Sequence, residues 1–292
     1  MSDKKRFTSE WMLISELKPV EIDISDFGYK KEYIEEHGLN ETKVFHWSNS
    51  TTGVMNYFEP LEVKSKDGLV YYRINENYVH MNEPDFFDTQ FGRFNNHNRG
   101  EFDSWLGKDG YEGLQEKERE MNALFDRSDY FIEGNFCDMF DCGEYAYAVS
   151  NLMHMGLGEF KIVRIDKNLE AVTLYCNSND EGWNSFKYLG RFENEQGHVV
   201  IVSGITQPSR SQPDIPYKER TLLLQIDYSG SCTIIREWNY CISSPNSMVE
   251  FEGFVYFGQN KMVTRLNVET GEIAYFTNKS NEELDALVEW EW

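Results

Sequence analysis

Three segments in the second half of the chain share one pattern, and their spacing is the strongest constraint on its fold. Each segment has an apolar stretch, a second stretch, a polar turn and a third stretch. The first stretches begin at about Tyr145, Val199 and Phe254, so successive starts are 54 and 55 residues apart. The turns, at 166–168 and 227–230 and 267–271, contain Asp, Asn and Gly, which tolerate tight reversals between antiparallel strands. A near-constant period of this length is typical of radially arranged β-sheets.

This rhythm resembles that of β-propeller repeats, including the WD40-like and quinoprotein-like types. The resemblance covers roughly residues 130 to 278, and the turn from Val268 to Ile273 carries it most clearly, although the chain lacks the Trp-Asp dipeptide of WD40 repeats. Short β-like runs between residues 42 and 81 add further strands. Together they predict about four to five sheet units, within the range of roughly 4 to 8 blades of closed propellers. The resemblance therefore implies a mainly β fold, a propeller or partial propeller of antiparallel sheets.

A few peripheral helices are expected to accompany the sheets. Residues 9–17 place Trp11, Ile14 and Leu17 three apart, residues 30–37 have helix-forming composition, and residues 111–128 carry one apolar face. We therefore predict an N-terminal helical extension at 1–40 that packs on a propeller-like domain at 41–292. The segment 204–220 contains three prolines and is predicted to be an exposed loop, which is either a second contact surface or an excursion without function.

The charge of the chain constrains its partners. With 50 acidic against 28 basic residues, the net charge is −22, which repels nucleic acid and anionic lipid and attracts basic proteins. No apolar segment has the length of a signal sequence or a membrane span. Five cysteines form no dense framework, which favours a reducing compartment. We expect a cytoplasmic protein that binds neither nucleic acid nor membrane.

Motifs of common enzymes are missing from the sequence. It has no GxxxxGK[ST], GxSxG, HExxH or GxGxxG after a strand, so we predict no catalytic residues and no cofactor. Cys137 and Cys142 lack the second closely spaced pair that zinc requires, so no metal site is predicted. His97 lies beside Asn, Arg and Glu residues and could serve acid–base chemistry, but an Asn-rich turn that satisfies its own backbone is the favoured interpretation.

The leading functional hypothesis is a non-enzymatic module that binds a basic protein. In composition and size the chain resembles bacterial immunity proteins, and the resemblance implies neutralisation of a basic protein toxin through an acidic surface. Two alternatives are a carbohydrate-active hydrolase with carboxylates in a propeller funnel and aromatics that stack on sugar rings, and an intracellular scaffold. The residues predicted to bind the partner are exposed acids near loops: Glu101, Asp103, Asp138, Asp141 and Glu144.

Overall fold

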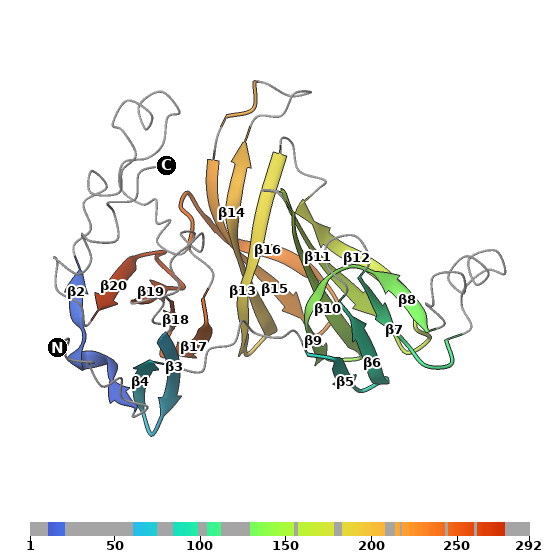
Figure 1. The fold of residues 1–292 in the computed structure, drawn as a ribbon, viewed down its shortest axis with the longest axis horizontal. Helices are drawn as coiled ribbons and strands as arrows, with labels where there is room; N and C mark the ends of the chain where they lie inside the picture. Colours follow the sequence, from blue (N-terminus) through green and yellow to red (C-terminus); the bar gives the residue numbers. More distant parts are fainter. Residues whose placement is uncertain are drawn as a thin grey trace, which may run out of the picture.

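Antiparallel β-strands dominate the computed structural model of the protein (Figure 1). Within the described residues no α-helix occurs, and the one helical element is the 3-10 turn η1 at Ile14–Glu16. The structure describes residues 11–20, 61–74, 84–98, 104–111, 129–154, 157–177, 183–207, 214–216, 218–242, 245–259 and 262–277.

The strands group into five successive sheet units. The first unit contains β3 (Leu61–Lys66) and β4 (Leu69–Ile74), with β1 (Met12–Leu13) beside β4. The second unit is a four-stranded meander of β5 (Phe86–Thr89), β6 (Gly92–His97), β7 (Trp105–Gly107) and β8 (Tyr130–Glu133).

The three predicted repeats form the other units, and each gains a strand at its start. The third unit is β9 (Phe136–Cys142), β10 (Tyr145–His154), β11 (Leu157–Ile165) and β12 (Ala171–Cys176). The fourth is β13 (Trp183–Asn194), β14 (Gly197–Gln207), β15 (Lys218–Asp227) and β16 (Cys232–Trp238). The fifth is β17 (Ser247–Phe251), β18 (Phe254–Gly258), β19 (Val263–Asn267) and β20 (Ile273–Thr277). A parallel bridge between Gly158 and Ser185 joins the third and fourth units into one eight-stranded sheet.

The polar turns of the repeats close by the same local chemistry. The side-chain oxygens of Asp166, Asp227 and Asn267 each accept hydrogen bonds from backbone N–H groups two to four residues later. Short polar side chains at the start of a turn mimic a backbone acceptor in this way. The prediction of antiparallel repeats with Asp or Asn turns is therefore confirmed in detail.

Buried apolar layers join the sheet units in the order second, third, fourth, fifth and first. One cluster joins the second unit to the third, one the third to the fourth, one the fourth to the fifth, and one the fifth to the first. Strand β14 shows the consequence, because Val200 and Val202 face the third unit while Val199 and Ile201 face the fifth. A strand buried on both faces must be a continuous apolar run, as this one is. The described residues thus form a mainly β, propeller-like fold.

The N-terminal segment contributes a strand to both the first and the fifth units. Strand β1 pairs with β4 of the first unit, and β2 (Lys18–Val20) pairs with β20 of the last unit. Leu17, between them, is buried in the layer that joins these units. The α-helix predicted at 9–17 is wrong over the described part, because an apolar period of three residues matches a 3-10 turn instead of an α-helix.

The predicted loop at 204–220 is also shorter than expected. Gly204, Ile205 and Thr206 pair with Arg220, Glu219 and Lys218, so both arms of the segment extend β14 and β15. The three prolines that suggested a loop all lie between these two arms. The predicted helix at 30–37, residues 112–128 of the helix predicted at 111–128 and the domain boundary at residue 40 lie outside the described residues. No helix in the described ranges is long and apolar enough to cross a membrane.

The apolar layer between the first and fifth units predicts how two substitutions in β3 and β4 affect stability. Leu61 on β3 is 0% exposed and packs in the layer between the first and fifth units. Leu61→Ala is expected to lower the free energy of unfolding by about 2–5 kcal/mol, because it leaves a cavity between two sheets. Leu69→Ala in the same hairpin is the matched control: Leu69 is 47% exposed, so its loss should change stability by no more than about 0.5 kcal/mol. Urea unfolding of both variants measures the difference, and equal effects would contradict the packing.

Candidate functional site

The first hairpins of the five sheet units have the same construction. In each unit the first two strands are joined by a two-residue turn, at 67–68, 90–91, 143–144, 195–196 and 252–253. In Figure 1 the labelled first hairpins of the second and third units lie side by side. The Gln90 side chain confirms the contact, because its Nε2 donates to the carbonyl oxygens of Gly143 at 3.3 Å and Tyr145 at 3.0 Å.

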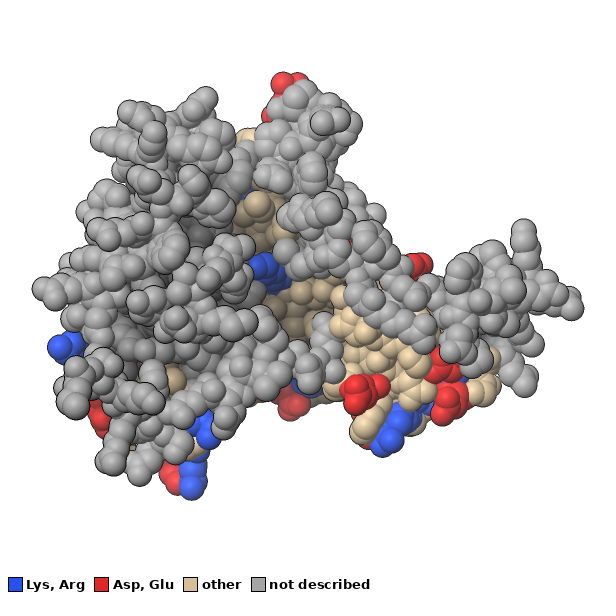
Figure 2. All heavy atoms as spheres, in the orientation of Figure 1, with Lys and Arg blue, Asp and Glu red and all other residues tan. Residues whose placement is uncertain are grey.

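Carboxylates recur at equivalent positions in these hairpins. In four units the penultimate residue of the first strand is acidic, and in four units the two-residue turn contains an acidic residue. We call this set the acidic hairpin row; its members are Asp67, Asp88, Asp141, Glu144, Glu193, Glu195, Glu250 and Glu252. Acidic side chains are visible along the lower edge of the molecule in Figure 2, where some basic ones accompany them. The recurrence makes the row a property of the repeat.

Part of the row is engaged in local contacts. Asp88 forms an ion pair with Arg93 at 3.0 Å, and the hydrogen bond from that guanidinium lowers the pKa of Asp88. Asp141 accepts the backbone N–H of Gln90 at 2.8 Å, and Glu250 accepts that of Gly253 at 2.9 Å.

The remaining carboxylates are more open to a partner. The Glu193 side chain is 77% exposed. Within the part of the chain that the structure describes, no ion pair joins Glu144, Glu195 or Glu252 to a basic side chain, and all three are exposed. These open carboxylates are the ones best placed to attract a positively charged partner.

A polar network lies behind the row, between the third and fourth units. Asp138 on β9 accepts hydrogen bonds at the same oxygen from the Tyr188 hydroxyl at 2.5 Å and from Arg191 Nε at 2.9 Å. The Arg191 guanidinium also lies over the Phe140 ring, 4.3 Å from its centroid. Desolvation by burial, reinforced by the negative charge of Asp138, raises the pKa of Tyr188 well above its ordinary value. Asp138 on β9 therefore binds two side chains of β13 and holds these two strands together.

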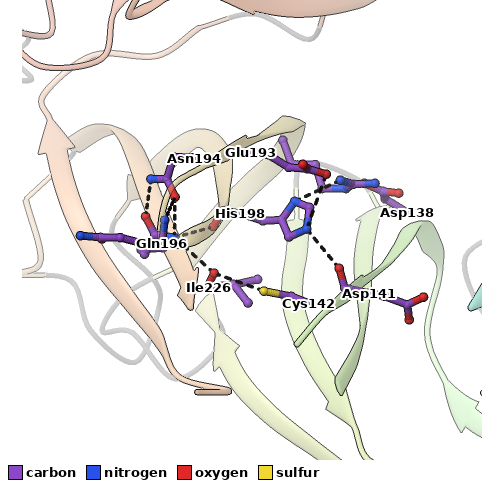
Figure 3. A network of polar contacts seen from close by, with 10 residues as sticks. Asp138, Asp141, Cys142, Glu193, Asn194, Gln196, His198 and Ile226 are labelled. Carbon is purple, nitrogen blue, oxygen red and sulfur yellow. Dashed lines mark hydrogen bonds and ion pairs between the residues drawn. The ribbon is translucent and has the colours of Figure 1, made fainter. Parts of the chain in front are cut away.

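His198 extends the network, and its contacts define its tautomer (Figure 3). Its Nε2 lies 3.1 Å from the carbonyl oxygen of Asp141, which can only accept, so Nε2 carries the proton. Its Nδ1 then accepts from Arg191 Nη1 at 3.2 Å. Desolvation by burial and the nearby charge of Arg191 lower the pKa of His198. A second proton would place Nδ1–H against a guanidinium, so the neutral imidazole is the stable form.

The hairpin end of β14 is fixed by uncharged groups. Gln225 Nε2 donates to the backbone oxygen of His198 at 3.2 Å, and Asn194 Nδ2 donates to Gln225 Oε1 at 2.7 Å. The Cys142 thiol lies 3.8 Å from the backbone oxygen of Ile226, also in Figure 3, and desolvation by burial raises its pKa. Such a thiol is a poor nucleophile at neutral pH. The network is thus suited to hold the hairpins in position.

The residues predicted to bind a partner fall into three groups. Asp141 and Glu144 belong to the acidic hairpin row. Asp138 differs from the exposed acid that we expected, because its side chain is 23% exposed and paired with Arg191. Glu101 and Asp103 lie outside the described residues. Glu193 and Glu250 were missed, although alignment of the repeats on their turns would have placed both opposite Asp141.

The favoured interpretation of His97 was wrong. Residues 92–97 form strand β6, not a turn, and His97 Nε2 lies 2.8 Å from Asp129 Oδ2. The His97 ring stacks on the buried Trp105 ring with centroids 4.4 Å apart. Desolvation by burial raises the pKa of Asp129, but hydrogen bonds from Asn95, His97 and Trp105 outweigh it and hold that pKa below its ordinary value. This carboxylate binds three side chains of the second unit together.

Comparison with known proteins adds little to this geometry. No protein-family model matches the chain, and no curated protein matches it. Among solved structures, it is similar to a mutant of the Bombyx mori GH32 beta-fructofuranosidase BmSUC1 in complex with sucrose, at 12% sequence identity and a TM-score of 0.28. The match covers 78% of this chain and 48% of that one, so the chain spans about half the length of the fructofuranosidase. At this TM-score the likeness supports no assignment of fold or activity.

The neutral His198 predicts a dependence of stability on pH. Because the pKa of His198 is lowered from 6.5 in the folded protein, the unfolded chain takes up a proton more readily below that pH. The free energy of unfolding should therefore fall as the pH is lowered through 6.5, by about 1.4 kcal/mol for each unit of pKa difference. Urea unfolding at about pH 7.5 and 5.5 should show a smaller fall for His198→Gln than for the wild type. The same fall in both proteins would contradict the lowered pKa and the neutral form of His198.

Proposed function

We propose that this protein binds a basic protein partner through the acidic hairpin row and does not act as an enzyme. The observation that carries the proposal is the recurrence of carboxylates at equivalent positions in successive sheet units. Scattered acids would give only solubility, whereas a repeated row gives one face a continuous negative potential. A partner of complementary charge would be guided to that face and held by many weak contacts.

The net charge of the chain supports the same proposal. At −22 it provides a long-range attraction for a basic protein, and the row concentrates part of that charge on one face. Neutralisation of a basic toxin is one specific form of this function, because an acidic face can cover the surface with which such a toxin contacts nucleic acid or another acidic target. The common requirement is a positively charged partner surface.

The contacts of Asp138 are those of a structural carboxylate and not of a hydrolase acid or base. A glycoside hydrolase needs one carboxyl group that donates a proton and a second that acts as base or nucleophile. Asp138 accepts from both Tyr188 and Arg191 and so serves as an acceptor within the fold. Its contacts are those of a structural ion pair between β9 and β13.

A charge-neutralised variant tests the proposal. The triple variant Glu144→Gln, Glu195→Gln and Glu252→Gln removes three exposed carboxylates from the row. We expect the tagged wild-type protein to capture one basic, stoichiometric partner from a lysate of its source organism at low salt and to release it at high salt. The triple variant should bind that partner up to about tenfold more weakly, because each lost contact costs a fraction of a kcal/mol.

The control variant also loses three carboxylates, but at strand ends away from the acidic hairpin row. Asp85, Glu133 and Asp214 are exposed acids that lie at the far ends of their strands or in the β14–β15 connection. Asp85→Asn, Glu133→Gln and Asp214→Asn should leave capture intact. Equal weakening of binding in both triple variants would show that only net charge matters, and an affinity of the row variant equal to that of the wild type would refute the proposal.

A further inference from the structure

The polar turn between β15 and β16 lies at the same end of the molecule as the acidic hairpin row. Asp227 in this turn pairs with Gly197, which directly follows the 195–196 hairpin turn of the fourth unit. The turn also abuts the first hairpin of the third unit, because a Cβ at Gly143 would lie 2.7 Å from the Tyr228 carbonyl oxygen. It therefore adjoins two hairpins of the row.

The Tyr228 side chain in this turn is open to solvent. Its exposed fraction of 58% is the largest among the large apolar residues that the structure describes. Within the described ranges, no other ring or cation packs on its ring, and no hydrogen bond engages its hydroxyl group. Tyr145 differs, although a Cβ at Gly230 of the same turn would lie 2.6 Å from its ring: the Arg164 guanidinium lies over that ring, 4.6 Å from its centroid. An arginine thus already occupies one tyrosine at this turn, and the other is open.

Local hydrogen bonds fix the backbone that carries Tyr228. Asp227 Oδ1 accepts the N–H of Ser229 at 2.9 Å. Arg164 Nη1 donates to the backbone oxygen of Gly230 at 2.8 Å, so the third unit also holds the turn. A tyrosine on a fixed backbone loses little conformational freedom when a partner binds, and tyrosine is enriched among the residues that dominate binding energy at interfaces. Tyr228 thus has the properties of an interface anchor.

The charges around Tyr228 favour a basic side chain of a particular kind. Glu144 and Glu195 are exposed carboxylates on the two hairpins that the turn adjoins. The hydrogen bond from the Ser229 hydroxyl lowers the pKa of Asp227, so this carboxylate is also ionised at neutral pH. A guanidinium is planar, stacks on tyrosine rings and pairs with carboxylates, whereas an ammonium group is a compact point charge. An arginine therefore fits this surface better than a lysine.

We propose that Tyr228 is the anchor through which this protein recognises an arginine side chain of its basic partner. The guanidinium stacks on the Tyr228 ring and pairs with Glu144, on the hairpin that the Tyr228 backbone contacts. The inference rests on the proposed function and deepens it. The acidic hairpin row attracts the partner by charge, and Tyr228 selects arginine among basic side chains.

Hexaarginine and hexalysine peptides carry equal charge, and the ratio of their affinities tests the anchor. Dissociation constants of both peptides are measured by fluorescence anisotropy at low salt. Tyr228→Ala leaves the charge of the protein unchanged, and it should lower the preference for hexaarginine by about threefold relative to the wild type. Tyr228→Phe keeps the ring and should keep the preference. Ile234→Ala is the matched control, because Ile234 is 46% exposed in the middle of β16 and its loss should leave the preference unchanged.

The outcomes separate the anchor from the row. A lowered preference in Tyr228→Ala alone supports the proposal. An unchanged preference in Tyr228→Ala, or an equal loss in Tyr228→Phe or Ile234→Ala, overturns the anchor. The proposed function survives that result if the variant Glu144→Gln, Glu195→Gln and Glu252→Gln binds both peptides more weakly than the wild type. Absence of binding of either peptide to the wild type at low salt overturns the anchor and also counts against the proposed function.

Discussion

The apolar layers between neighbouring sheets are the interaction on which the rest of the structure depends. Each layer fixes one unit against the next, and the layer around Leu61 and Tyr256 brings the first unit against the last. Hairpins separated by more than fifty residues in sequence therefore share one face of the molecule. This packing brings the carboxylates of separate hairpins into one row. The row produces a negative electrostatic potential that no single hairpin could produce.

Behind the acidic hairpin row, the charged side chains are paired within the fold instead of being open to a partner. Asp138 and Arg191 compensate one another at 2.9 Å, and His198 is held neutral by its contacts with Arg191 and the Asp141 backbone. Leaving either ion unpaired in this partly buried layer would cost free energy, so the network keeps the hairpins in place without adding net charge. The net negative charge lies on the acidic hairpin row, where water solvates it and a partner can reach it.

The sequence predicted the repeats well because strands buried on both faces, such as β14, must be apolar runs and their turns require Asp, Asn or Gly. It predicted that Asp141 and Glu144 are exposed acids beside a turn, and both are exposed there. It could not predict that Asp138 would meet Arg191, because that pairing depends on how β9 packs against β13. The error at His97 has the same origin: Asp129, its partner, lies on the connection before β8, far from the Asn-rich segment that suggested a turn.

The most direct test of the account is the rate of association between this protein and the partner it captures, measured as a function of ionic strength. If the row acts as one surface, the association rate constant of the wild type should fall about tenfold or more between low and physiological salt, while the dissociation rate constant changes little. For the variant Glu144→Gln, Glu195→Gln and Glu252→Gln, the association rate constant should be lower at low salt and should fall less steeply as salt is raised. Equal, salt-independent association rate constants for both proteins would contradict the account.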